Sequence, residues 1–177
     1  MLIRNAQQED ARAIALVRVD SWRSTYRGLL PASFLNGLSY RDAEHHWNGI
    51  LADPAQHGWA YVAEADGGQV VGFSLCGRTR DPLLPLEGEL FALYLLQSHQ
   101  RRGIGRQLFL AAVHQLRRAG LRGMLVWALE TNQPARAFYE RMGGTPAGQK
   151  NSVFGGMRVI QVAYRWDDLS QWDAESP

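Results

Sequence analysis

Cysteine is nearly absent from this sequence, since Cys76 is the only one among 177 residues. A single cysteine excludes a disulfide within the chain and is typical of a protein from a reducing compartment. Cys76 lies in an apolar, strand-like run without a basic neighbour, so we expect a buried, unreactive thiol. The histidines His45, His46 and His57 lack cysteine or carboxylate company at metal-ligand spacing, and we expect no metal site.

Long hydrophobic runs are also missing. The first residues, Met1 to Arg4, contain no signal-peptide core, and no uninterrupted apolar run approaches the length of a membrane span. The formal net charge is only +2, which gives no support to nucleic-acid binding. Hydrophobic residues make up 46% and charged residues 20%, as in ordinary globular proteins of one domain. We therefore expect a cytoplasmic domain with neither a nucleic acid nor a membrane as partner.

Two familiar phosphate-binding motifs are absent as well. No G-x-x-x-x-G-K-[ST] loop occurs, and the third glycine of a dinucleotide-binding turn is replaced by Leu108. Instead, a strand-like run from Glu89 to Leu96 is followed by a basic turn with Gly103 and Gly105, and a long amphipathic helix begins there. This order places backbone N–H groups and a helix positive end at one point, which suits an anion such as phosphate. A G-x-G pair in isolation is often only a tight turn.

Periodicity and turn residues predict an alternation of strands and helices. Gly120 and Gly143 are expected to end helices, and Pro134 suits the first turn of one. The strand near 88–96 is mostly apolar and is expected to be buried on both faces. Residues 167–177 are polar and are expected to form a loose C-terminal tail. The expected strands are 1–5, 59–64, 69–76, 88–96, 124–128 and 153–166, and the expected helices are 8–26, 40–51, 102–119 and 131–142.

The segment from Gln100 to Gly105 reads Gln-Arg-Arg-Gly-Ile-Gly and fits the pattern Q/R-x-x-G-x-G/A directly after a strand. A second strand ends at Asn132, before a helix that carries Phe138 and Tyr139. In this motif, its setting and the order of elements over nearly the whole chain, the sequence resembles the GCN5-related N-acetyltransferase (GNAT) family. The resemblance implies an α+β fold, a three-layer α/β arrangement in which helices flank a mixed, central, splayed sheet. Residues 1–166 would form that single domain.

The same resemblance implies that acetyl-CoA binds as co-substrate between the two strands, which splay apart in this family. Backbone groups of Leu93 and Leu95 would pair with the pantetheine arm, and the N–H groups of the loop would hold the pyrophosphate. A proline common in the family two residues after the strand is replaced here by Gln97, which leaves the shape of the strand end open. The predicted cofactor-binding residues are Leu93, Tyr94, Leu95, Gln100, Arg101, Arg102, Gly103, Ile104, Gly105, Arg106 and Asn132.

Acetyl transfer to an amine needs a proton acceptor, because a lysine-like amine with a pKa of about 10.4 is mostly charged at neutral pH. The resemblance indicates Glu89 as that base, acting directly or through water, with Glu87 as the alternative on the same face. Tyr139 aligns with the family's general acid and would protonate the leaving thiolate, while the Leu95 N–H would polarise the thioester carbonyl. The competing interpretations are a strand-end carboxylate holding a structural hydrogen bond for Glu89 and a core aromatic for Tyr139.

The acceptor side is less clearly indicated. Trp22 and Tyr26 are spaced i and i+4, so they share a helix face that lines the acceptor pocket in similar acetyltransferases, although such pairs also occur in cores. The resulting hypothesis is an acetyl-CoA-dependent N-acetyltransferase that acts directly on a primary amine of a small molecule or peptide. The alternatives are a non-catalytic CoA-binding or sensing module and a transferase of another acyl group. The resemblance also makes a homodimer plausible.

Overall fold

The computed structural model describes residues 1–80 and 84–172. Within them, strands from both halves of the chain form one seven-stranded sheet in the order β1-β2-β3-β4-β5-β7-β6. All neighbours are antiparallel except β4 and β5, which run parallel. The strands are β1 (Leu2–Asn5), β2 (Trp59–Glu64), β3 (Val70–Arg78), β4 (Gly88–Leu95), β5 (Met124–Leu129), β6 (Thr145–Phe154) and β7 (Met157–Trp166).

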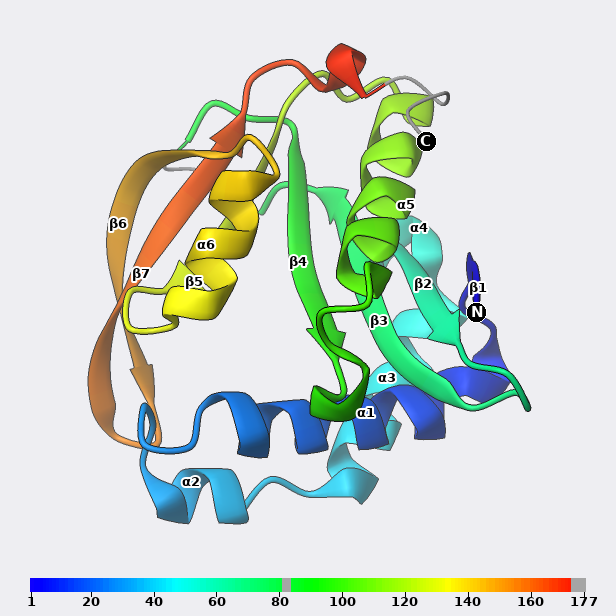
Figure 1. The fold of residues 1–177 in the computed structure, drawn as a ribbon, viewed down its shortest axis with the longest axis vertical. Helices are drawn as coiled ribbons and strands as arrows, with labels where there is room; N and C mark the ends of the chain where they lie inside the picture. Colours follow the sequence, from blue (N-terminus) through cyan, green and yellow to red (C-terminus); the bar gives the residue numbers. More distant parts are fainter. Residues whose placement is uncertain (81–83, 173–177) are drawn as a thin grey trace.

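Helices cover both faces of the sheet and its lower end (Figure 1). In that view α5 and α6 lie in front of the sheet, α3 and α4 lie behind it, and α1 and α2 cross below β4. The mixed sheet between helical layers confirms the predicted fold class. The helices are α1 (Ala11–Thr25), α2 (Ala32–Asn36), α3 (Tyr40–Ala52), α4 (Pro54–His57), α5 (Ile104–Arg118) and α6 (Gln133–Arg141).

The predicted turn chemistry is present at the helix ends. Gly120 follows α5 with φ +77°, and Gly143 follows α6 with φ +78°, so both take the left-handed conformation that favours glycine after a helix. At the start of α3 the Ser39 hydroxyl accepts a hydrogen bond from the Asp42 N–H at 3.1 Å. Pro134 lies in the first turn of α6, where its missing donor is harmless. Gly120, Gly143 and Pro134 were predicted in these roles, whereas the Ser39 cap is seen only in the structure.

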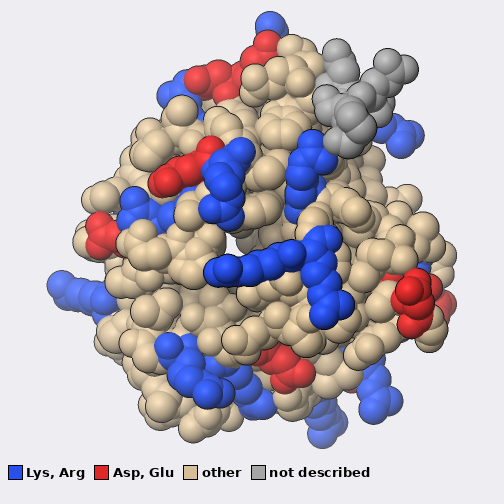
Figure 2. Space-filling view, viewed as in Figure 1, with Lys and Arg blue, Asp and Glu red and all other residues tan. Residues whose placement is uncertain are grey.

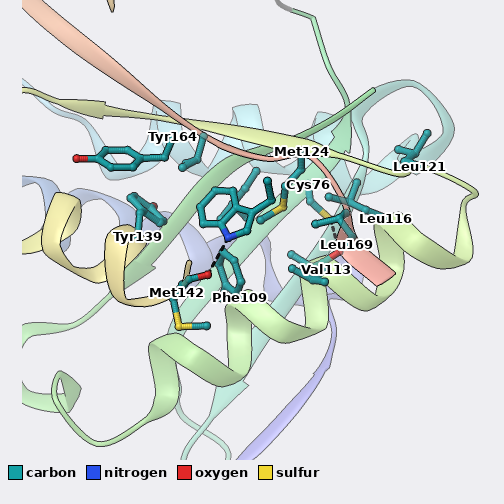
Figure 3. Close-up of a cluster of buried hydrophobic side chains, with 14 of the residues drawn as sticks. Cys76, Phe109, Val113, Leu116, Leu121, Met124, Tyr139, Met142, Tyr164 and Leu169 are labelled. Atoms are coloured by element: carbon teal, nitrogen blue, oxygen red, sulfur yellow. Dashed lines mark hydrogen bonds between the residues drawn. The ribbon is translucent and has the colours of Figure 1, made fainter. Parts of the chain in front are cut away.

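A large hydrophobic cluster joins α5 and α6 to the sheet (Figure 3). Phe109 of α5 packs on Trp166 of β7, and the Trp166 indole N–H donates to the Met142 carbonyl at 2.7 Å. Cys76 is fully buried in the same cluster, where burial raises the pKa of its thiol to about 12. This high pKa favours the protonated thiol, and the prediction of a buried cysteine is confirmed. On the opposite face, Trp47 of α3 packs on Phe73 of β3.

The C-terminal hairpin differs from the prediction of one strand over 153–166. Two ten-residue strands, β6 and β7, pair there around a turn at Gly155 and Gly156, both of which have positive φ. The first strand was missed because 145–152 contains a proline, a glycine and several polar residues, which all have low strand propensity. Since β6 is an edge strand, most of its side chains remain exposed. The short helices α2 and α4 were also missed.

Two further expectations were wrong in detail. Strand β4 is not buried on both faces along its length, because only Gly88, Leu90 and Leu95 are fully buried and the other residues are partly exposed. The expected loose tail is also incorrect for 167–172. Leu169 is fully buried, and the Trp172 ring packs on Phe109 with centroids 5.5 Å apart. Two apolar residues were enough to anchor this otherwise polar segment; residues 173–177 lie outside the described part of the chain.

Among the described residues, no helix combines the length and the apolar character that a membrane span requires.

Candidate active site

The central feature of the site is a gap between β4 and β5. The two strands pair only at Gly88 with Met124 and at Glu89 with Leu125, although β4 continues to Leu95. The Leu96 N–H donates to the Val71 carbonyl at 2.9 Å, on the side of β3. Because successive N–H groups of a strand point to opposite edges, the Leu95 N–H points into the gap. The splayed edge expected from the sequence is therefore present, with Leu93 and Leu95 on it.

The basic loop after β4 has the backbone conformation of an anion-binding turn. Arg101 has φ 59° and Gly103 has φ 80°, so two left-handed residues flank Arg102. Alternation of this kind turns successive N–H groups towards one point. Gly103 is also the N-cap of α5 and has no side chain to cap the helix, so the first N–H groups of α5 are open to a ligand.

Glycine occurs at the two positions of the loop for different structural reasons. A Cβ on Gly103 would meet no atom within 4 Å, so its positive φ is the reason for glycine at this position. A Cβ on Gly105 would lie 3.7 Å from the Phe138 ring and 4.0 Å from the Leu93 side chain, which are ordinary contacts. Gly105 therefore faces the space between α6 and β4. A larger side chain there would fill this space.

Positive side chains surround this region. Figure 2 shows Lys and Arg gathered around a hollow over the gap between α5 and α6. The loop and first turn of α5 contribute Arg101, Arg102 and Arg106, which are exposed, and no acidic residue lies in that turn. Gln100, the other predicted loop residue, donates its side-chain amide to the Leu95 carbonyl at 3.2 Å. This bond ties the loop to the end of β4.

Asn132 and Tyr139 lie on the other side of the gap. The Asn132 side-chain oxygen accepts from the Ala135 N–H at 3.3 Å and caps α6. Tyr139 is 6% exposed and packs among Phe138, Tyr164 and Trp166. Figure 3 labels Tyr139 and Tyr164 in this cluster. Its hydroxyl makes no hydrogen bond to any described residue. Burial raises the pKa of Tyr139 well above its ordinary value of 10.0, so the phenol is protonated at neutral pH and can donate.

Glu89 lies on β4 where the gap begins. Its side chain alternates with that of Leu90, which packs under α5, and therefore projects on the opposite face of the sheet. One carboxylate oxygen accepts from the Thr79 hydroxyl at 3.4 Å and from the Arg80 N–H at 3.3 Å. Its predicted alternative, Glu87, accepts from the Arg122 N–H at 2.9 Å. Both carboxylates thus accept hydrogen bonds from backbone N–H groups, and Glu89 is the one next to the gap.

Trp22 and Tyr26 belong to an aromatic cluster below the gap. The Trp22 ring lies 4.9 Å from Tyr26, 6.1 Å from Phe34, 6.2 Å from Tyr94 and 5.8 Å from Phe154. These residues come from α1, α2, β4 and β6, and Leu129 at the end of β5 joins the same cluster. The cluster therefore closes the lower end of the splay. We name these five aromatic residues the aromatic cluster.

The polar ends of several tyrosines lie near the gap. Burial raises the pKa of Tyr26 well above its ordinary value, and the neighbouring Tyr94 and Tyr139 add smaller effects in the same direction. Hydrogen bonding to Asn132 opposes this shift. Tyr26, predicted for the substrate, is thus close to Tyr94 and Asn132, which were predicted for the cofactor, and to Tyr139, which was predicted as the general acid.

A comparison of the chain with protein families gives one clear match. Residues 17–144 match the model of the acetyltransferase (GNAT) family. The chain belongs to this family. The resemblance seen in the sequence is therefore confirmed, and so is the prediction of an acetyltransferase at the level of the family.

Relatives and solved structures agree with this assignment. The uncharacterized N-acetyltransferase YuaI of Bacillus subtilis is 36% identical over 168 residues, which cover 95% of this chain and 94% of YuaI. The PaiA N-acetyltransferase from Thermoplasma acidophilum, solved with coenzyme A, superposes with a TM-score of 0.69 at 20% identity, covering 93% of this chain and 98% of PaiA. YncA from Salmonella typhimurium, solved with acetyl-CoA, superposes with a TM-score of 0.71 at 18% identity. The superposition covers 100% of this chain and 97% of YncA.

Three aromatic residues of this acetyltransferase were not identified as candidates by their side chains. Tyr94 was predicted only for its place beside the cofactor, and Phe34 and Phe154 were not singled out. Phe34 lies on the short helix α2, and Phe154 ends the strand β6, so both lie on elements that sequence patterns did not reveal. The available signal was their position beside Pro31 and beside Gly155-Gly156, where the chain turns. Among the described residues no group of three or more metal-ligating side chains occurs.

Proposed function

We propose that this protein transfers the acetyl group of acetyl-CoA directly to a primary amine of a small molecule or peptide. The observation that carries the proposal is the position of the gap. It lies between the open N–H groups of α5 on one side and the aromatic cluster, with Tyr26 near Tyr139, on the other. A donor and an acceptor could therefore meet at Tyr139 from opposite sides. The names of YuaI and PaiA as N-acetyltransferases support the same reaction type.

The donor side fits a CoA moiety. A pyrophosphate would lie against the turn of Arg101 and Gly103 and the first turn of α5, where open N–H groups and a helix positive end favour negative charge. Leu93 and Leu95 would offer backbone groups to an amide-containing arm in the gap, as a neighbouring strand would. The Leu95 N–H would donate to the acyl carbonyl oxygen and stabilise its developing charge.

Protons would move at two residues of this chain. As the bond from the amine nitrogen to the acyl carbon forms, Glu89 accepts a proton from the nitrogen, directly or through water. As the carbon–sulfur bond breaks, Tyr139 donates its phenolic proton to sulfur, which becomes the free thiol. No protein nucleophile is needed, in agreement with the inert environment of Cys76. The products are an N-acetylated amine and CoA.

The test is turnover with a defined panel of amines. The purified protein is given acetyl-CoA and amino acids, short peptides, polyamines and aromatic amines, while thiol release is followed and acetylated products are identified by mass spectrometry. The proposal expects a product that depends on both enzyme and amine. Tight acetyl-CoA binding by calorimetry without any product would instead indicate a CoA-binding module. The observation in favour of that second function is that the Glu89 carboxylate already holds the Thr79 hydroxyl and the Arg80 N–H.

A further inference from the structure

Three side chains form a stripe along α1. Arg18, Trp22 and Tyr26 are each four residues apart, so they lie one helical turn from one another. The Arg18 guanidinium lies 4.7 Å from the centre of the Trp22 ring, which in turn lies 4.9 Å from the Tyr26 ring. Tyr26 is close to Tyr139, the proposed proton donor. The stripe therefore leads from a positive charge to the reacting end of the gap.

Arg18 has donors available for a ligand. It is half-buried and forms neither an ion pair nor a hydrogen bond with any residue that the structure describes. With Ser39, Asp42 and His46 it lines a hollow of about 300 Å³ between α1 and the start of α3. Asp42 is not within ion-pair distance of Arg18. A guanidinium offers a planar fork of N–H donors that matches a carboxylate, and stacking on Trp22 holds that fork in place.

Trp22 offers a second donor. The residue is 8% exposed, and its buried indole N–H makes no hydrogen bond of normal geometry, although the Tyr94 hydroxyl lies near it. Buried donors are nearly always paired, because an unpaired one has lost its water without compensation. Unlike the other tryptophans with unpaired N–H groups, Trp22 is surrounded by the aromatic cluster at the end of the gap. An oxygen of a bound acceptor would complete its hydrogen bonding.

The part of the site around Trp22 and Tyr26 is apolar, since the side chains packed there are aromatic or aliphatic. Of the nearby acidic residues, Asp42 lines the same hollow as Arg18, and Asp20 accepts a hydrogen bond from the Tyr40 hydroxyl at 2.6 Å at the surface. A second positive charge placed against the aromatic cluster would therefore lose hydration without an anionic partner there. An acceptor with a single amine is favoured instead, because apolar surroundings lower the pKa of that amine and favour the neutral form that attacks.

We propose that the acceptor is a small primary amine that also carries a carboxylate, with Arg18 binding the carboxylate and the Trp22 indole N–H donating to one of its oxygens. This inference rests on the proposed function, since it names the acceptor class for the same site. The body of the acceptor between amine and carboxylate would lie against the aromatic cluster. Recognition would thus come from two donors on one helix face, and selectivity against dications from the apolar surroundings of Trp22 and Tyr26.

Matched compounds test the carboxylate. Phenylalanine is compared with its amide and with 2-phenylethylamine, 6-aminohexanoate with hexylamine, and spermidine serves as the polycation. In at least one of the two sets the carboxylate should raise kcat/KM about tenfold or more over its uncharged counterparts, as expected for charge-assisted hydrogen bonds. Calorimetry on the CoA-loaded protein should show the same order of affinity, independently of turnover.

Two variants test the residues. Arg18→Gln should raise KM for the carboxylate substrate about tenfold, and should raise KM for the uncharged amine far less. Arg12 is an exposed arginine on the same helix, so Arg12→Gln is the control. It should change KM neither for the carboxylate substrate nor for the uncharged amine. Trp22→Phe keeps an aromatic ring but removes the N–H. It should weaken binding of the carboxylate substrate less than Arg18→Gln does. Unfolding temperatures of all variants should match the wild type within a few degrees.

The outcomes separate the two proposals. Spermidine or the uncharged amines as the better substrates would overturn the carboxylate inference but leave N-acetyl transfer intact. An equal loss of kcat/KM in Arg18→Gln for the carboxylate acceptors and for the uncharged ones would overturn the role of Arg18. Acetyl-CoA binding without acetylation of any compound would overturn the proposed function and the inference together.

Discussion

Phe34 on α2 and Gly155 in the β6–β7 turn are in direct contact, because a Cβ added at Gly155 would lie 2.4 Å from the Cβ of Phe34. This contact joins the N-terminal helices to the C-terminal hairpin across the lower end of the gap. Phe154, the neighbour of Gly155, also packs against Phe34 with ring centroids 6.2 Å apart. The two elements therefore cover the aromatic cluster from opposite ends of the sequence.

The first prediction concerns this contact. Gly155→Ala should push α2 and the turn apart, raise KM for the acceptor several-fold and leave acetyl-CoA affinity unchanged. Gly156→Ala is the matched control, because Gly156 also has positive φ but nothing lies within 4 Å of an added Cβ. In both variants the unfavourable φ should lower the free energy of unfolding by about 1 kcal/mol or more. Only the further loss seen in Gly155→Ala is therefore due to the contact with Phe34. Equal KM values and unfolding temperatures for the two variants would contradict the prediction.

The second prediction concerns Tyr139. Tyr139→Phe should lower kcat roughly 100-fold, as expected when a general acid is removed, with little change in acetyl-CoA affinity. The ring contacts remain and the hydroxyl bonds no described residue, so the unfolding temperature should not fall. Tyr164→Phe is the control, since the Tyr164 hydroxyl donates to Glu140 and accepts from Arg136. It should lose stability by about 1 kcal/mol but keep kcat. Unchanged turnover in Tyr139→Phe would exclude the acid role.

The donor half of the molecule could be predicted from the sequence because local signals define it. Gly103 and Gly105 between a strand and a helix, and Asn132 before Pro134, are short patterns whose geometry depends on neighbours in sequence. The structure places them around one gap, and their contacts with the cofactor stay a prediction. The splay itself followed from the family resemblance, since nothing within β4 or β5 shows that their pairing stops at Glu89 and Leu125.

The acceptor half could not be predicted to the same depth because it is assembled from distant segments. The aromatic cluster combines Trp22 and Phe34 with Phe154, which lies more than a hundred residues further along the chain. No periodicity within one helix reveals such a contact, and two of its elements were not predicted. The tail was misjudged for a similar reason. The burial of Leu169 depends on the α5 side of the sheet, far from it in sequence.

The third prediction concerns the phosphate loop. Gly105→Glu should abolish acetyl-CoA binding, because the carboxylate would fill the space beside Phe138 and Leu93 and repel the pyrophosphate. Gln107→Glu adds the same charge two residues further along α5, at an exposed position, and should weaken binding only a few-fold. Calorimetry with acetyl-CoA measures both, and circular dichroism checks that both variants fold. Equal affinities in the two variants would mean that the pyrophosphate lies elsewhere.

The last prediction concerns pH and the N-terminal segment. The Arg4 guanidinium donates to both oxygens of Asp10, at 2.7 and 2.9 Å, and also to Glu64 at 2.7 Å. The hydrogen bond from Arg4 is the main reason that the pKa of Asp10 is lowered below its ordinary value of 3.8. A carboxyl whose pKa is lower in the folded state stabilises the fold above its unfolded pKa, and this contribution disappears as pH falls through the folded pKa.

Wild-type stability should therefore fall below about pH 4 by more than that of Asp10→Asn, which has no carboxylate to protonate at this site. At neutral pH the variant should be the less stable of the two, because Arg4 loses one charged partner while partly buried. Urea unfolding at a series of pH values measures both effects. Asp53→Asn serves as the comparison, because the Asp53 carboxylate is exposed and accepts from the Gln56 N–H rather than from an arginine. Parallel pH profiles for wild type and Asp10→Asn would show that the Arg4 pair contributes no pH-dependent stability.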